Sequence, residues 1–179
     1  MLEISDRELE ILNFYRASEL EGGLLLGQMV RRARDAQLAL ELTRHSAEEV
    51  GHAQLWTETI IAVGGGIRPV RNTYQARYAR VIGAPVTMLQ VLALTQVFER
   101  RVYRHFTEHL RLPGTHQAVR ATLQRMLDEE KGHLRWVKTW LDRQAMRGAD
   151  VTSTMRQYAK ADAEIYEELT RHYAWRQAA

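Results

Sequence analysis

The sequence predicts an all-α protein: an antiparallel four-helix bundle of two helix hairpins joined by a long crossover, with a fifth helix towards the C-terminus. Apolar residues recur every three to four positions over long stretches, whereas the alternation typical of strands is scarce. Glycine and proline gather in short stretches near residues 64–69, 83–85, 112–114 and 148, and these separate the periodic segments. We expect one domain over residues 1–179.

The periodic segments predict five long helices. They cover residues 6–32, 35–63, 84–110, 115–146 and 152–176. Ser5 or Asp6 is the expected N-cap of the first helix, because a short polar side chain can accept a hydrogen bond from the first turn. A tight turn near Arg34 and Asp35 joins the first two helices, so we expect them to run antiparallel.

The second hairpin is predicted in the same way. A tight turn at Pro113 and Gly114 joins the helices over 84–110 and 115–146. Between the hairpins, residues 64–83 are numerous enough to run the length of a bundle, and a short helix over 72–81 is expected along this crossover. The four long helices of residues 6–146 would then form the bundle.

The helix over 152–176 carries an apolar stripe on one face. The stripe consists of Met155, Tyr158, Ile165, Leu169, His172 and Tyr173. It predicts a helix that packs on the outside of the four-helix bundle. The alternative is the seam of a homodimer.

Composition excludes several kinds of chemistry. The chain has no cysteine, which rules out disulfides, thiolate zinc sites, iron–sulfur clusters and a cysteine nucleophile. Its net charge of +3 is too small to indicate a nucleic-acid partner. No apolar window is long enough to span a membrane, and the N-terminus lacks a signal-peptide pattern, so we expect a cytoplasmic protein with no membrane partner.

A short pattern, Glu-Glu-x-Gly-His, occurs twice, at residues 48–52 and 129–133, once in each predicted hairpin. Its chemical unit is Glu-x-x-His, which places a carboxylate and an imidazole one turn apart on one helix face. A glutamate oxygen and a histidine nitrogen together suit iron or manganese. The Glu-x-x-His spacing alone is weak evidence for metal binding in a chain with many glutamates. Stronger evidence comes from which of these residues lie on the apolar, inward faces of their helices.

The apolar stripes turn one glutamate inward on each of four helices. Glu49 and Glu130 lie on the stripes of their helices, whereas Glu48 and Glu129 do not. Glu19 and Glu99 are likewise enclosed by apolar residues at three- and four-residue steps. A buried ionised glutamate costs several kcal/mol unless it is paired or binds a metal. Four such residues, with no basic residue on the stripes, therefore indicate metal ions.

The order of these residues also repeats. Glu19 precedes Glu49 and His52, and Glu99 precedes Glu130 and His133, at intervals of 30 and 31 residues between the glutamates. In this pattern the chain resembles the ferritin-like di-iron carboxylate superfamily, which includes rubrerythrins, bacterioferritins and small di-iron hydroxylases. The resemblance covers about residues 6–146 and implies two iron ions. Manganese or a mixed pair is the alternative. The implied ligands are Glu19, Glu49, His52, Glu99, Glu130 and His133.

Several neighbouring residues have more than one interpretation. Glu21 competes with Glu19 as the ligand on the first helix, and His45 is either a further ligand or a hydrogen-bonded core residue. Tyr103 follows Glu99 by one turn and either hydrogen-bonds a ligand or simply packs, and Tyr15 stands in the same relation before Glu19. The pair Gly22 and Gly23 either permits close helix packing or leaves space for dioxygen or substrate.

The resemblance implies an oxidoreductase, because two ferrous ions side by side can reduce dioxygen by two electrons. The leading hypothesis is an oxygenase or oxidase, of hydroxylase or monooxygenase type, acting on a small organic substrate and supplied by a separate electron donor. A rubrerythrin-like peroxidase acting on peroxide is the second hypothesis, although such proteins commonly receive electrons from a cysteine-ligated rubredoxin domain. The non-enzymatic hypothesis is a ferritin-like iron-storage or metal-binding subunit, which would require a shell of 12 or 24 copies.

Overall fold

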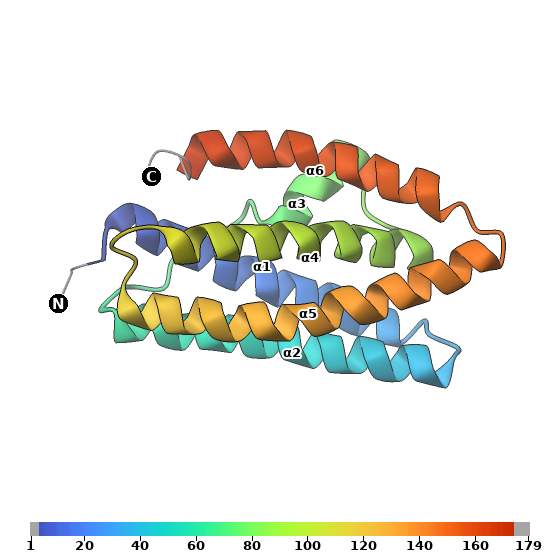
Figure 1. Ribbon diagram of the computed structural model, residues 1–179, viewed down its shortest axis with the longest axis horizontal. Coiled ribbons are helices and arrows are strands. Elements are labelled where there is room, and N and C mark those ends of the chain that lie inside the picture. The colour runs from blue at the N-terminus through green and yellow to red at the C-terminus, as the bar shows by residue number, and fades with distance from the viewer. Residues whose placement is uncertain (1–3, 174–179) are drawn as a thin grey trace. The chain divides into compact units, whose positions relative to one another are not determined.

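The computed structural model describes residues 4–173, which form six α-helices and no strand (Figure 1). The helices are α1 (Asp6–Val30), α2 (Ala36–Ala62), α3 (Tyr74–Ile82), α4 (Met88–Arg111), α5 (Gln117–Met146) and α6 (Val151–Tyr173). The predicted all-α class is confirmed, including the short helix in the crossover. The predicted end of the last helix, residues 174–176, lies outside the described residues. No helix in residues 4–173 is long and apolar enough to cross a membrane.

Polar side chains begin three of these helices. The Ser5 hydroxyl accepts a hydrogen bond from the Glu8 backbone N–H at 3.1 Å, and the Asp35 carboxylate accepts one from the Leu38 N–H at 2.8 Å. Helix α4 begins four residues later than predicted. Thr87 caps it, and Gln90 accepts a hydrogen bond from the Thr87 N–H at 3.0 Å.

The late start of α4 has a local cause. Ala84 precedes Pro85, and the proline ring disfavours helical backbone in the residue before it. The reciprocal capping box of Thr87 and Gln90 then offers a better start two residues after the proline. A helix that began at residue 84 would have needed helical backbone directly before the proline and would have lacked the capping box.

The chain divides into two compact units. The first contains the residues up to 75 together with 116–122, and the second contains 76–115 together with the residues from 123 onward. Helices α1 and α2 lie in the first unit and α4 and α6 in the second, whereas α5 begins in the first unit and lies mostly in the second. Each unit is described below by itself. That the two hairpins form one ferritin-like domain stays a prediction.

In the first unit, α1 and α2 pack as an antiparallel hairpin along a seam of small residues (Figure 1). The Ser46 hydroxyl donates a hydrogen bond to the Gly23 carbonyl at 2.7 Å, and a Cβ placed on Gly27 would lie only 3.0 Å from the Ser46 Oγ. Glycine at both positions therefore allows the two helices to approach closely. Fully buried apolar side chains of this unit fill the hairpin: Leu12, Phe14, Leu42, Trp56 and Ile60.

The crossover runs back along α1. The buried Asn13 side chain donates to the Gly66 carbonyl at 3.2 Å and accepts from the Arg68 N–H at 2.7 Å. Further along, the Gln75 side chain donates to the Ser18 carbonyl at 2.9 Å. The two hydrogen bonds of Asn13 satisfy polar backbone groups of a segment that has no secondary structure before α3, and the bond of Gln75 ties the start of α3 to α1.

In the second unit, a short connection follows α4 and leads into α5, and α6 packs on α4. The connections turn at Gly114 and Gly148, whose φ angles of 85° and 86° strongly favour glycine. Helix α6 buries three residues of its predicted stripe within its own chain, since Tyr158, Ile165 and Leu169 are at most 3% exposed, whereas Met155 is half-buried and His172 is exposed.

Candidate metal centre

The first unit buries a cluster of two glutamates and a histidine. Glu19 comes from α1, and Glu49 and His52 come from α2. The His52 Nδ1 lies 3.8 Å from the Glu19 Oε2 and 3.8 Å from the Glu49 Oε1. All three side chains are at most 2% exposed, and each offers a ligand atom within 4.8 Å of the others. We call these three residues the first cluster.

Local sequence positions this cluster. Glu49 and His52 are three residues apart and therefore share one face of α2, between the buried Leu42 and Trp56. Gly22 and Gly23 bring α1 against that face. A Cβ on Gly22 would lie 3.1 Å from the Glu49 Oε2, and a Cβ on Gly23 would lie 3.1 Å from the Glu49 Cβ. Of the two roles considered for these glycines, the contacts favour close helix packing.

His45 extends the first cluster along α2. Its Nε2 lies 3.2 Å from the Glu49 Oε1, and both side chains are 1% exposed. This geometry suits a hydrogen bond that orients the Glu49 carboxylate, and it also leaves His45 at a distance from which it could bind an ion held by Glu49. Its role as a ligand stays a prediction.

The second unit buries an equivalent cluster. Glu99 comes from α4, and Glu130 and His133 come from α5. The His133 Nδ1 lies 3.2 Å from the Glu130 Oε2 and 4.0 Å from the Glu99 Oε1. Exposure is again at most 2% for each of the three. We call these residues the second cluster.

The structure also places the neighbouring residues for which the sequence allowed more than one role. Glu21 accepts a hydrogen bond from the Thr73 hydroxyl, so its carboxylate is engaged with the crossover. The Tyr15 ring lies 5.2 Å from the Trp56 ring and is buried. Tyr103 is half-buried on α4, one turn after Glu99. Its role as a partner of the site stays a prediction.

The outward-facing members of the two motifs behave differently from the clusters. Glu48 is half-buried, and Glu129 is 38% exposed and pairs with Arg125 at 3.1 Å. Of the two adjacent glutamates in this motif, Glu129 therefore forms an ion pair at the surface, whereas Glu130 is a buried carboxylate. This contrast supplies a control residue within one turn of a candidate ligand.

The chemistry of the donor set fits metal ions. Each cluster combines two buried carboxylates with an imidazole, and hard oxygen donors with one or two nitrogens suit iron or manganese. Burying several carboxylates together is expensive without cations. Ions held at these atoms would remove that cost. The structure therefore contains two buried histidine–glutamate groups that could hold metal ions.

Sequence reasoning missed a buried ionic network in the second unit. Asp162 on α6 is 6% exposed, forms an ion pair with Arg101, and accepts a hydrogen bond from the Tyr78 hydroxyl at 2.7 Å. Burial, and then the charge of Asp162, raise the pKa of Tyr78, so this phenol stays protonated as the donor. One signal was present: a charged residue at position 162 interrupts the apolar stripe between Tyr158 and Ile165.

No family model, no characterised protein and no solved structure matches this chain. The functional conclusion therefore depends on the chemistry of the two clusters.

Proposed function

We propose that this chain is a non-haem di-iron oxidoreductase that uses dioxygen to oxidise a small organic substrate, as an oxygenase or oxidase of hydroxylase type. One observation carries the proposal: each unit buries the same set of groups. Glu19 with Glu49 and His52 in the first unit corresponds to Glu99 with Glu130 and His133 in the second. In this proposal these six side chains are the metal ligands.

Charge supports a pair of divalent ions. The four glutamates are at most 2% exposed, and if ionised they carry four negative charges, which two divalent cations neutralise. One ion would leave two buried charges without compensation, at a cost of several kcal/mol. The donor atoms suit manganese as well, and iron is proposed because the repeated pattern resembles that of di-iron carboxylate proteins.

The chain's own residues suggest what reaction the ions would serve. When bound, a pair of ferrous ions supplies two electrons to dioxygen or peroxide. The surroundings of the clusters are apolar and aromatic, with Tyr15, Trp56 and Phe106 all buried, which suits exclusion of water and contact with an organic substrate. The chain lacks cysteine, so we propose that a separate donor protein or small molecule supplies electrons.

Anaerobic titration with Fe(II) tests the proposal. The wild-type chain should bind two ions, measured by metal analysis after desalting, and exposure to air should then produce near-ultraviolet absorption from oxidised iron. Glu130→Gln should lose at least one ion. Glu129→Gln is the matched control, because it changes the adjacent residue in the same way at a 38% exposed position, and it should keep two ions.

Two results would refute the di-iron site. One is a correctly folded wild-type chain that retains no iron or manganese. The other is equal metal content in Glu130→Gln, Glu99→Gln and the Glu129→Gln control. Thermal unfolding gives an independent readout, since an ion that binds only the folded state raises the melting temperature of the wild type.

A further inference from the structure

A cavity of about 350 Å³ opens between α4 and α6 in the second unit. Three of its lining residues, Arg100, Arg101 and Arg104, come from α4, and Arg156 comes from α6. Asp162 is the one carboxylate among the described residues that line it. The cavity therefore has a lining of strongly positive charge, and none of these residues belongs to the two clusters.

The single carboxylate is already committed to one of the arginines. Asp162 accepts from the Arg101 Nε at 3.0 Å as well as forming the ion pair, and it also accepts from Tyr78. The Arg101 guanidinium lies 3.9 Å above the Tyr166 ring, which holds it in place. Arg101 and Asp162 thus form a fixed, neutral wall of the cavity.

The other three arginines supply the excess charge. Arg100 and Arg104 are one helical turn apart on the same side of α4, and Arg156 faces the same cavity from α6. All three are exposed. Like charges gathered around one concavity repel each other, and an anion bound among them would relieve that repulsion.

We propose that this cavity binds a small phosphate monoester that carries a short apolar group. Guanidinium groups match phosphate oxygens in pairs, and a phosphate monoester carries nearly two negative charges at neutral pH. The lining also contains the buried Val97 and the half-buried Met155, which suit an apolar portion of the ligand. A volume of about 350 Å³ fits a small molecule rather than a bare ion.

This site is separate from the proposed ligands on the same helix. Glu99 does not line the cavity, and at about 100° per residue it lies about 150° around α4 from the mean direction of the four residues of that helix that do. This proposed site is therefore independent of the proposed oxidoreductase function. Ligand binding in the cavity can be measured on the metal-free chain, so the failure of one proposal leaves the other unaffected.

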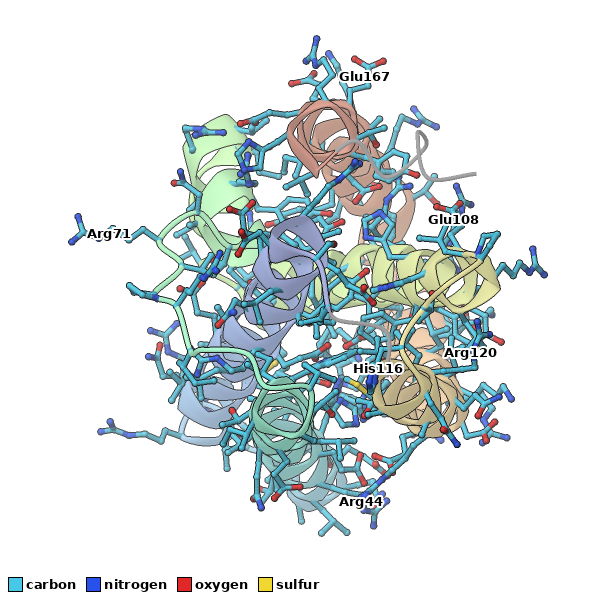
Figure 2. The ribbon with its side chains drawn as sticks, turned by 90° about the vertical axis from the view of Figure 1, so that its left-hand side faces the viewer. Arg44, Arg71, Glu108, His116, Arg120 and Glu167 are labelled. Atoms are coloured by element: carbon cyan, nitrogen blue, oxygen red, sulfur yellow. The ribbon has the colours of Figure 1, made fainter. Side chains whose placement is uncertain are left out.

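Isothermal titration calorimetry of the full chain with phenyl phosphate tests the proposal. Saturable binding of one molecule per chain is expected, with no binding of the neutral analogue benzyl alcohol. Arg104→Gln and Arg156→Gln should each weaken binding by about tenfold, the effect of losing one charge-assisted contact. Arg71→Gln is the matched control. Arg71 is exposed in the first unit and projects outward from its segment, so its loss should leave affinity unchanged (Figure 2).

Other outcomes would overturn the proposal. They are the absence of saturable binding, an equal loss of affinity in Arg71→Gln, or binding of benzoate as tight as that of phenyl phosphate. Binding of a single-stranded RNA oligonucleotide with the same arginine dependence, without binding of phenyl phosphate, would assign the surface to nucleic acid instead. Circular dichroism of each variant checks that it is folded, and both substituted arginines are exposed.

Discussion

Two glycines on facing helices should respond differently to one added methyl group. Gly23 lies in the seam between α1 and α2, where a Cβ would meet the Val50 Cγ2 at 2.9 Å, the Ser46 carbonyl oxygen at 3.0 Å and the Glu49 Cβ at 3.1 Å. Gly51 lies within α2, and a Cβ there would have no neighbour within 4 Å. We therefore expect Gly51→Ala to stabilise the fold, and Gly23→Ala to cancel that gain or to destabilise the fold.

The magnitudes follow from two opposing effects. Alanine is favoured over glycine inside a helix by about 1 kcal/mol, and both substitutions gain this amount. Only Gly23→Ala also forces atoms together, including a backbone oxygen that cannot rotate away, and overpacking of this kind costs about 1–3 kcal/mol. Gly51→Ala should therefore gain about 1 kcal/mol. Gly23→Ala should fall about 1–3 kcal/mol below it, because helix propensity cancels in the difference.

Urea unfolding of the metal-free chain, followed by circular dichroism, measures both free energies of unfolding. Gly132→Ala is a second control. It occupies the equivalent position in the other Glu-Glu-x-Gly-His motif, and a Cβ there would also have no neighbour within 4 Å. Equal stabilisation by Gly23→Ala and Gly51→Ala would show that the seam can accept a methyl group, and the argument for close packing against Glu49 would fail.

Two further predictions concern the second unit. Asp162→Asn should lower the free energy of unfolding by about 3–5 kcal/mol, because it leaves Arg101, whose side chain is only 11% exposed, without its carboxylate. Asp142→Asn, which breaks a surface pair with Lys138, should cost less than about 1 kcal/mol, and equal small losses in a urea titration would contradict this. His105 is 3% exposed, and burial together with the charges of Arg101 and Arg104 holds its pKa well below the usual value of 6.5. The unfolded chain therefore binds this proton first as the pH falls below 6.5, so stability should drop by about 2 kcal/mol between pH 6.5 and 5, at about 1.4 kcal/mol per unit. His105→Gln should lessen that drop, and an unchanged pH dependence would show that His105 is not the group responsible.

The helices and their inward faces were predictable because each depends on local sequence. A period of three to four residues identifies a helix face without any knowledge of what packs against it. The same period distinguished Glu130 from Glu129. The structure confirms the distinction, because Glu130 is 0% exposed and the Glu129 side chain is 38% exposed. The choice of Glu19 over Glu21 rested on spacing. The structure places Glu19 beside His52 and Glu21 beside Thr73, and the ligand role itself awaits metal analysis.

Contacts between elements far apart in the chain were not predictable. The ion pair of Arg101 with Asp162 joins α4 to α6, and the Tyr78 hydroxyl reaches the same carboxylate from α3. The position of Asp162 within an apolar stripe indicates that its side chain is buried, but nothing in that helix alone identifies Arg101 or Tyr78 as its partners. The arginine-lined cavity was missed for the same reason, since Arg100 and Arg104 on α4 and Arg156 on α6 gather only when those helices pack.

Charge connects the two proposals. The chain has 25 lysines and arginines against 22 aspartates and glutamates, but four of those glutamates are buried in the clusters. Asp162 is neutralised by its ion pair with Arg101, and the 18 acidic residues outside the clusters oppose 25 basic ones and leave an excess of about seven positive charges. The net charge of +3 is therefore the sum of a negatively charged interior, at the clusters, and a more positively charged exterior. The proposed ions would offset the repulsion among the buried carboxylates, which would make metal binding and folding one linked equilibrium. The exterior concentrates part of its positive excess where α4 and α6 enclose a cavity.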